Sequence, residues 1–500
     1  MAQAAVGSAD GTEAPLLPSS GAGTPPQQPA GAPRWNWFAF VCTTLASVTT
    51  MLNGYNLTLM SGAELFMRED VGLTDAEVEV LSGSMNVFML VSILAAGWVA
   101  DKLGRRRTLV LANAFLMAGA LAMSLGDSFT ALMAARFITS VGAGFARVVS
   151  PVYNAEISPA STRGVLSSML DMFINVGILL SYVSNYAFSG LPVHLGWRVM
   201  FGVGVIPPVF IAAGVLFIMP ESPRWLVMRG LHGDARAVLL RTSDAPAEAD
   251  LRLGEMKRAV ADAEPPHAAA RHGGGASVWK QLLVRPSTSV RRILTCVLGL
   301  QFFVMASGVE AILLYSPRVF KAVGMASNSA ILGATVAIGV VKTCFVLLGM
   351  LFTDRLGRRP LLLASTAGVA VTTAALAVTL YIGMSTTSSS TATAAACLAL
   401  VLAVVATFSV GYGSVGSASY TAEVLPLRLR AQGSSIAMAV NKLTAALVSM
   451  TFISLADVIT MPGCFFLYAA VTAAAFVFVY TRLPETKGRR LEDMELLFDK

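Results

Sequence analysis

Residues 97–107 read GWVADKLGRRR, and residues 354–360 read DRLGRRP. The two stretches share the order Asp, Leu, Gly, Arg, Arg, lie 253 residues apart, and each follows a long apolar run. Glycine permits a tight turn, and an aspartate at a helix end accepts bonds from backbone N–H groups or arginines. Two copies of one charged turn indicate that the chain contains two similar halves.

Two further pairs of loop motifs repeat at nearly the same offset. An acid and an arginine seven residues apart recur after 267 residues, and a Pro-Glu dipeptide recurs after 264. The paired positions are Glu156–Arg163 with Glu423–Arg430, and Pro220–Glu221 with Pro484–Glu485. This repeat predicts two parallel halves joined by a linker, the plan of alternating-access transporters that bind their substrate between the halves.

Long apolar runs separate these motifs. The chain is 55% hydrophobic and only 13% charged, whereas soluble globular proteins have about 25% charged residues. The runs match the roughly 17–25 residues of a membrane-spanning helix. Twelve spans are predicted, at about residues 37–58, 80–100, 108–126, 129–151, 165–188, 198–219, 291–315, 329–352, 361–383, 395–421, 432–455 and 462–481. The expected fold is an all-α membrane protein with twelve transmembrane helices in two pseudo-symmetric six-helix bundles.

Composition divides the chain into five parts. The first is rich in Ala, Gly, Pro and Ser and lacks the basic start and apolar core of a signal peptide. The predicted parts are a disordered tail at 1–33, an N-terminal bundle at 34–219, a linker with short helices at 220–290, a C-terminal bundle at 291–482 and a tail at 483–500.

Lysines and arginines set the expected orientation. Of the 36 such residues, 28 fall in tails and loops on one side of the predicted spans, and four fall on the other side. This asymmetry predicts that both tails are cytosolic. The net charge of +7 reflects the same bias, so nucleic acid is not an expected partner. The expected location is the plasma membrane rather than the vacuolar membrane.

Reactive side chains are placed where they form no catalytic or metal site. The five cysteines all fall within predicted spans, and the four histidines all fall in predicted loops. This pattern predicts no disulfide framework, no metal site and no cofactor. Because no nucleophile–base pair is recognisable, an enzyme is not expected.

The loop motifs as a set resemble the sugar porter branch of the major facilitator superfamily. The stretches that carry this resemblance are DKLGRRR, PVYNAEISPASTRG, PESPRWLVMRG, DRLGRRP, AEVLPLRLRAQG and PETKGRRLEDMELL. The runs ASGVEAILLYSPRVF and VWKQLLVRPS are similar to plant polyol and monosaccharide transporters. The resemblance covers about residues 35–495. It implies that the chain carries a polyol or monosaccharide across a lipid bilayer, usually together with protons.

Ionisable residues inside predicted spans are candidates for function, because a charge within the membrane is costly unless it is paired or used. The candidates are Arg136, Arg147, Asp171, Glu310, Lys342 and Lys442. Arg136 and Glu310 stand out, while each of the six could instead form only a bond that orients helices. Arg147, Asp171 and Lys442 are predicted near cytosolic helix ends, where water is within reach.

The resemblance implies a substrate site made by the fifth, seventh and eleventh spans. The matching positions hold Asp171, Glu310 and Asn441, and Gln301 lies one helical turn before Val304-Met305. Family members commonly have a Gln pair at that dipeptide, and a tenth-span Trp that this chain lacks. Because each buried hydroxyl needs partners, these departures predict a less hydroxylated ligand or weaker binding. They also leave open a non-transporting sensor or scaffold.

A second departure lies in LNGYNLTLMSGA, residues 52–63. In proton-coupled members similar to this chain, the first-span motif reads Gly-Tyr-Asp, and a fourth-span arginine tunes the carboxylate. This chain keeps Arg136 but has Asn56 in place of the acid, and an amide cannot titrate. The pair is expected to be a remnant of a proton site, so proton symport is the family expectation and uncoupled transport the alternative. The Arg136 guanidinium is then expected to bind water, backbone carbonyls or another acid, with Asp171 and Glu310 as the candidate acids.

The repeated loop motifs are expected to form a cytosolic charge network that breaks when the inner gate opens. Its predicted members are Asp101, Arg105, Glu156, Arg163, Asp354, Arg358, Glu423 and Arg430. The alternative is that these charges only set the orientation of the chain in the membrane.

Overall fold

The computed structural model describes residues 36–159, 162–263, 288–325, 327–385, 391–416, 419–425 and 430–487, and these residues are almost entirely helical. The predicted tail at 1–33 lies outside the described residues, as do residues 264–287 of the linker and 488–500 of the second tail.

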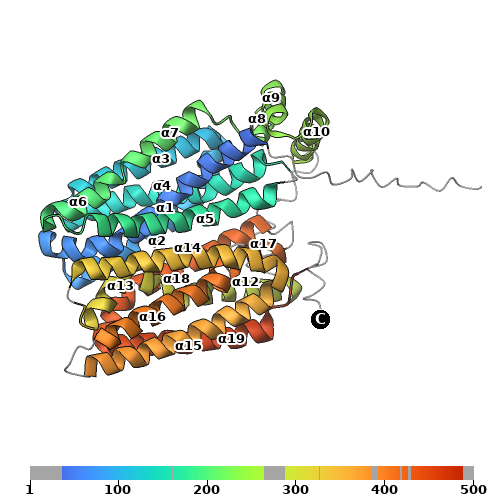
Figure 1. The fold of residues 1–500 in the computed structure, drawn as a ribbon. Coiled ribbons are helices and arrows are strands. Elements are labelled where there is room, and N and C mark those ends of the chain that lie inside the picture. Colours follow the sequence, from blue (N-terminus) through green and yellow to red (C-terminus); the bar gives the residue numbers. More distant parts are fainter. Residues whose placement is uncertain are drawn as a thin grey trace, which may run out of the picture. The chain divides into compact units, whose positions relative to one another are not determined.

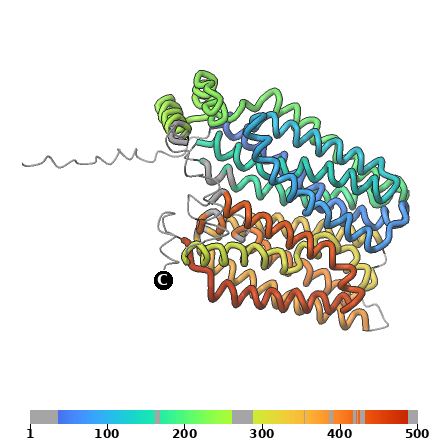
Figure 2. The backbone as a smooth tube through the Cα atoms, turned by 180° about the vertical axis from the view of Figure 1, so that it is seen from behind, coloured from blue at the N-terminus to red at the C-terminus, as the bar shows by residue number. Residues whose placement is uncertain are grey.

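The helices form two bundles that lie side by side in both views (Figure 1, Figure 2). The first contains α1 (Trp37–Val71), α2 (Asp75–Leu103), α3 (Arg105–Leu125), α4 (Phe129–Ile157), α5 (Arg163–Ala187), α6 (Val193–Val203) and α7 (Ile206–Phe217). The second contains α12 (Thr288–Ala306), α13 (Val309–Ala322), α14 (Asn328–Leu356), α15 (Arg358–Ser385), α16 (Thr391–Phe408), a π-helical segment (Ser409–Gly416), α17 (Ser419–Val424), α18 (Arg430–Ile459) and α19 (Met461–Arg482). Across the boundary, α5 packs against α14 and α2 packs against α18.

The two ends of the bundles differ. Short helices from the predicted linker, namely α8 (Pro223–Met228), α9 (His232–Thr242) and α10 (Pro246–Ala263), lie at one end (Figure 1). We call this the linker end, and the opposite end, which carries the turn between α1 and α2, the far end.

The helices account for twelve membrane crossings. Within the described residues, ten helices or helix pairs are long and apolar enough to span a bilayer by length and composition. Three of them consist of two consecutive segments, namely α6 with α7, α12 with α13, and α16 with the π-helical segment. The remaining two crossings are the more polar helices α1 and α5, of 35 and 25 residues.

Helix α1 extends beyond the span predicted for it. The span was expected to end near residue 58, whereas the helix continues to Val71 and ends at Gly72, whose φ of 73° is left-handed. Charged residues from Glu64 onward favoured a loop in the sequence. In the structure Glu64 is 2% exposed and pairs with Arg318 of α13 at 3.1 Å. The neighbouring helix therefore neutralises the charge that a loop would expose to water.

The seventh predicted span is broken in the middle. Helix α12 ends at Ala306 and α13 begins at Val309, and Gly308 between them has a φ of 80°. That left-handed conformation is readily available only to glycine. The break separates a segment that begins at the linker end from one that reaches the far end.

Glycines allow α1 and α5 to approach each other closely. A Cβ atom at Gly54 would lie 2.1 Å from the Ile174 carbonyl oxygen, and one at Gly177 would lie 2.0 Å from the Met51 carbonyl oxygen. Small residues at a helix crossing let the two backbones meet. This contact fixes the depth and rotation of α1, and with them the position of Asn56.

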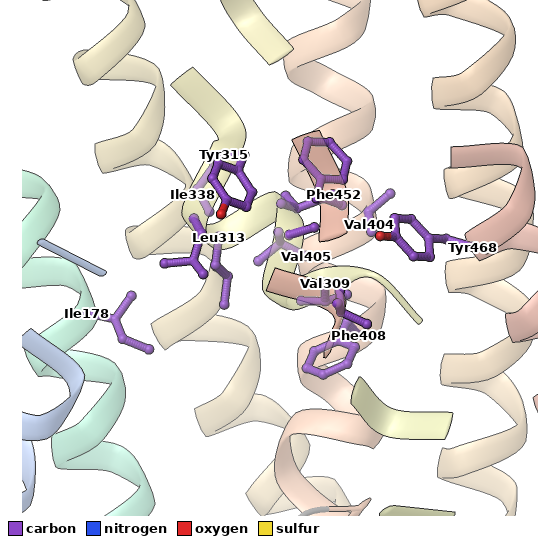
Figure 3. Packing of buried hydrophobic residues seen from close by; sticks show 14 of the residues in the cluster. Ile178, Val309, Leu313, Tyr315, Ile338, Val404, Val405, Phe408, Phe452 and Tyr468 are labelled. Carbon is purple, nitrogen blue, oxygen red and sulfur yellow. The ribbon is translucent and has the colours of Figure 1, made fainter. Parts of the chain in front are cut away.

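Aromatic rings hold α13 against α18. Tyr315 of α13 stacks on Phe452 of α18 with ring centroids 5.3 Å apart, and Tyr468 of α19 lies 6.5 Å from Phe452 (Figure 3). The Tyr315 hydroxyl is buried by this packing and donates a hydrogen bond to the Ser449 carbonyl at 2.6 Å.

Candidate functional site

The turn between α2 and α3 is capped by an acid from the linker. Gly104 has a φ of 95°, and a Cβ atom there would lie 2.4 Å from the Glu221 carboxylate. Glu221 accepts hydrogen bonds from the backbone N–H groups of Arg105 at 2.7 Å and Arg106 at 3.1 Å. The carboxylate therefore caps the positive end of the α3 helix dipole.

The Arg105 side chain lies between two acids. It pairs with Asp101 at 3.0 Å and with Glu156 of α4 at 3.2 Å. The side chains of Arg105 and Glu156 are each 8% exposed, whereas Asp101 is 61% exposed. Ser222 also donates to Glu156 at 2.5 Å. The buried pair with Glu156 thus joins α3 to α4, and the linker is tied to the same acid.

The second bundle repeats this arrangement. Gly357 has a φ of 96°, and Glu485 accepts from the N–H groups of Arg358 at 3.0 Å and Arg359 at 2.9 Å. The Arg358 side chain pairs with Glu423 at 2.9 Å. The repeat that the sequence shows in its loops is therefore a repeat of one capped and charged turn.

Four backbone N–H groups donate hydrogen bonds to the Glu485 carboxylate and stabilise its ionised form. Burial raises its pKa, but the hydrogen bonds from those N–H groups outweigh burial and hold the pKa below its usual value. Glu485 therefore stays ionised at neutral pH, which its capping role requires.

The structure brings together five residues that were predicted for the charge network. They are Asp101, Arg105 and Glu156 in the first bundle, and Arg358 and Glu423 in the second. The side chains of Arg163, Asp354 and Arg430 lie outside the described residues. Capping by Glu221 and Glu485 was not predicted, although the repeat of their Pro-Glu motifs is the signal that could have indicated it.

Two of the predicted substrate-binding residues contact each other inside the second bundle. Asn441 of α18 donates to the Gln301 side-chain oxygen at 2.9 Å, and Gln301 of α12 donates to Thr421 of α17 at 3.0 Å. Gln301 and Asn441 are 2% and 7% exposed. Their amide groups therefore link three helices of the bundle through hydrogen bonds.

A third predicted residue, Glu310, takes part in a bridge between the bundles. Asn86 of α2 donates to the Glu310 carboxylate at 3.3 Å, and Lys442 of α18 donates to the Asn86 side-chain oxygen at 3.3 Å. Asn86 is fully buried, and it was not predicted as a site residue. The signal was an amide inside the apolar run predicted as the second span.

Lys342 lies in the same region. Its ammonium group lies 5.4 Å from the centre of the Phe408 ring, a favourable position for a cation, and within electrostatic range of Glu310. Lys442 is also within range of Glu310. Glu310 is thus a carboxylate at the interface that lies within range of two ammonium groups.

Asp171 lies apart from the other predicted substrate-binding residues. It is eight residues into α5, about 12 Å from the start of that helix at 1.5 Å per residue, and within electrostatic range of Arg147. Among the described residues its carboxylate makes no hydrogen bond to Gln301, Glu310 or Asn441. Helix α5 reaches the second bundle beside Glu310 through Tyr182, which donates to the Leu313 carbonyl of α13 at 2.7 Å, rather than through Asp171.

The structure places Arg136 next to Asn56, but through the backbone. Arg136 of α4 is fully buried, and it donates to the carbonyl oxygens of Asn56 at 3.1 Å and Leu81 at 3.3 Å. The Asn56 side chain donates to the Leu52 carbonyl instead. Of the partners predicted for Arg136, the backbone carbonyls are the ones observed, and within the described residues neither Asp171 nor Glu310 forms an ion pair with it.

Ion pairs join the bundles at the far end. Arg318 of α13 contacts Glu64 of α1 at 3.1 Å and Asp75 of α2 at 2.8 Å. Asp75 also pairs with Arg68 of its own bundle at 3.0 Å. This contact could not be predicted from the sequence, because it depends on which ends of α1, α2 and α13 meet.

A second far-end contact involves the backbone of α18. Glu79 of α2 accepts hydrogen bonds from the N–H groups of Ile453 at 2.5 Å and Ser454 at 3.1 Å, and from the Ser454 hydroxyl. Glu79 is 2% exposed. The far end is thus closed by two buried acids of the first bundle. Within the described residues no group of three potential metal ligands is found.

Residues 42–498 match the family model described as Sugar (and other) transporter. The chain belongs to this family. It is therefore a multi-pass integral membrane protein and a transporter rather than an enzyme.

Relatives of this sugar transporter family member extend over nearly its whole length. "Polyol transporter 5" of Arabidopsis thaliana is 46% identical over 94% of this chain and 88% of its own length. "Putative polyol transporter 1" of the same plant is 47% identical over 92% of this chain and 91% of its own. Among solved structures, the proton:xylose symporter XylE bound to 6-bromo-6-deoxy-D-glucose is 25% identical with a TM-score of 0.74, covering 93% of this chain and 100% of that one. Nothing in these comparisons supports the alternative of a sensor.

Proposed function

We propose that the chain carries polyols or monosaccharides by alternating access between its two bundles, which we place at 34–219 and 291–482. Two relatives are named polyol transporters, and a similar structure is a proton:xylose symporter. The observation that carries the proposal is the polar bridge at the interface, where Asn86 of one bundle contacts Glu310 and Lys442 of the other.

Gln301, Glu310 and Asn441 are the proposed substrate-binding residues of the second bundle. Gln301 and Asn441 satisfy each other in this arrangement. A sugar hydroxyl both donates and accepts hydrogen bonds. It can therefore replace the hydrogen bond between the Gln301 and Asn441 side chains without leaving either amide unpaired. Asn86 supplies a contact from the first bundle, and Asp171 supplies another once the bundles move together around the substrate.

We place the linker end and both tails in the cytosol, and the protein in the plasma membrane. The excess of lysine and arginine on that side supports this orientation. The ion pairs of Arg318 with Glu64 and Asp75 then close the extracellular end. The charge networks of Arg105 and Arg358 lie at the cytosolic end, where their helices rearrange as the inner gate opens and closes.

Of the properties expected from the family, proton symport is the one that the residues of this chain support least. We propose that proton coupling is weak or lacking here. Coupling needs a group whose protonation differs between the two access states. Asn56 has no such proton, and its neighbour Arg136 contacts its backbone only. The competing possibility is coupling through another acid, for which Glu310 is the first candidate because it lies at the interface.

Uptake into liposomes containing the purified protein tests both proposals, namely transport of polyols or monosaccharides and weak or absent proton coupling. A panel of labelled polyols and hexoses is offered with and without an acidic outside. We expect saturable uptake that stops at equal concentrations and does not respond to a protonophore. Accumulation that a protonophore abolishes would overturn the uncoupled mechanism but leave polyol transport standing. Failure to take up any of the panel would overturn transport of this substrate class.

A further inference from the structure

Arg136 carries a positive charge that the surrounding protein leaves uncompensated. The side chain is 0% exposed. Its Nε and Nη1 atoms donate to two backbone carbonyl oxygens, those of Leu81 and Asn56. Its Nη2 atom has no hydrogen-bond partner in the part of the chain that the structure describes. Carbonyl groups offer partial charges only, so they orient the guanidinium without neutralising it.

No acid neutralises this guanidinium among the described residues. The ion pairs found there engage other arginines, and the titratable side chain within range of Arg136 is Tyr315, whose phenol is uncharged at neutral pH. The α1 residue whose backbone Arg136 contacts, Asn56, has an amide side chain, and that amide donates to the Leu52 carbonyl. A buried cation without a counter-charge is strongly unfavourable, so an ion from solution is a natural partner.

A second unpaired donor lies close by. Ser82 directly follows Leu81 on α2 and is 1% exposed, and its hydroxyl has no partner within 3.5 Å in the described structure, although it lies near enough to the Tyr315 hydroxyl for a weaker interaction. The Tyr315 hydroxyl in turn lies within range of Arg136. Two orphaned donors, one of them cationic, therefore border the same region between α2, α4 and α13.

We propose that a small monovalent anion, chloride being the physiological one, binds at the Nη2 atom of Arg136 with the Ser82 hydroxyl as its second donor. One negative charge balances the guanidinium, whereas a divalent anion would leave an excess charge buried. A compact ion needs few donors, and two are unpaired here. The ion takes the electrostatic role that a carboxylate at position 56 would have.

This assignment has a specific consequence for the cycle. Arg136 contacts α1 and α2, the two helices that carry the far-end acids Glu64 and Glu79. An anion that neutralises Arg136 stabilises the packing of these helices. Binding of the anion and closure of the far end are then coupled, without the anion crossing the membrane.

Direct binding tests the proposal on the full-length protein, whether or not it transports polyols. Radiolabelled chloride is measured on purified protein in gluconate buffer, together with the thermal unfolding midpoint in chloride and in gluconate. We expect saturable chloride binding and a higher midpoint in chloride. Asn56→Asp supplies a carboxylate, so it should lose chloride binding and make the midpoint insensitive to chloride. Ser82→Ala should weaken chloride binding by roughly five-fold or more.

Asn113→Asp is the matched control. Asn113 is a fully buried amide of α3 that donates to Thr49 and to the Leu109 carbonyl, so its change adds the same charge away from the Arg136 contacts. It should keep wild-type chloride affinity. Wild-type protein that binds no chloride, and so satisfies Arg136 with water, would overturn the proposal. Undiminished binding in Asn56→Asp, or in Ser82→Ala if the first variant does not fold, would overturn the assigned donors.

Discussion

Replacing Arg318 by glutamine should open the far end. Arg318 is the residue of the second bundle that pairs with both Glu64 and Asp75 of the first. Arg318→Gln keeps a long polar side chain but removes the charge. Glu64 is then left buried, with its side chain 1% exposed, opposite a neutral group. The closed arrangement loses stability, while an arrangement in which water reaches Glu64 does not.

The size of this effect follows from the burial of the pair. Removing one partner of a buried ion pair costs about 3–5 kcal/mol, and the lower figure applies because Arg318 is 16% and Asp75 40% exposed. Burial raises the pKa of Glu64 to about 7 even beside Arg318, and loss of the arginine raises it further. Protonation therefore relieves part of the loss near pH 7, and the full effect is expected at a higher pH, where Glu64 stays ionised. There a loss of about 3 kcal/mol raises the ratio of open to closed protein roughly a hundred-fold.

Spin labels across the far end measure that ratio. Cysteines replace Glu69 of α1 and Lys321 of α13, both exposed, and the exposed Cys344 is changed to serine. Arg318→Gln should shift much of the distance distribution to longer values. The control is Arg68→Gln, which removes a pair to the same Asp75 within one bundle and with the side chains 51% and 40% exposed. Such a pair is worth about 0–1 kcal/mol.

Two results would contradict this reasoning. If Arg318→Gln leaves the distance distribution unchanged, the ion pair does not hold the far end closed. If Arg68→Gln opens the far end as much, the charge of Asp75 rather than the contact between bundles is responsible.

Three further predictions concern the substrate site and the linker end. Glu310→Ala and Gln301→Ala should each raise the KM for polyol uptake or abolish uptake. Each variant loses a hydrogen bond worth about 0.5–1.5 kcal/mol, or up to about 3 kcal/mol for a charged group. If the KM is unchanged in both variants, the substrate site lies elsewhere. Asp101→Asn should slow uptake at equal surface expression by weakening the hold on the neighbouring arginine, and wild-type rates would remove Asp101 from the gating network. Glu485→Gln should lower the thermal unfolding midpoint at neutral pH. Because the pKa of Glu485 is lowered in the folded protein, its stabilisation is present above the usual glutamate pKa and is lost as the pH falls through the lowered value; equal loss of stability with acid in wild type and Glu485→Gln would contradict this.

The architecture and the linker-end turns could be predicted because they depend on local sequence. Apolar runs near bilayer length specify spans, and a glycine followed by arginines specifies each capped turn, as Gly104 and Gly357 show. The glycine break at Gly308 was missed because the apolar run continues through it, and hydropathy does not register a change in φ. Helix α1 was predicted too short for the opposite reason, since Glu64 is charged yet buried.

The candidate site could be predicted only in part, because its contacts depend on which helix faces meet. Gln301 and Asn441 were named from their residue types, and the structure adds that they contact each other. Asn86 was missed, since nothing along α2 shows that this amide meets Glu310. That Arg136 takes backbone carbonyls rather than an acid is likewise a result of packing, with α1 brought close by its glycine contact to α5.

One turn of α18 has a property that bears on the energy of the transport cycle. In an α-helix the N–H of Ile453 bonds to the carbonyl of Ser449. Here Glu79 of the first bundle also accepts from that N–H, while Tyr315, of the same bundle as Ser449, donates to that carbonyl. When the bundles part at the far end, Glu79 is withdrawn and the Ile453 N–H is left with the Ser449 carbonyl as its helical partner. Opening therefore strands no backbone group of this turn in the apolar interior, and its cost is confined to the Glu79 carboxylate, which gives up its bonds to Ile453 and Ser454.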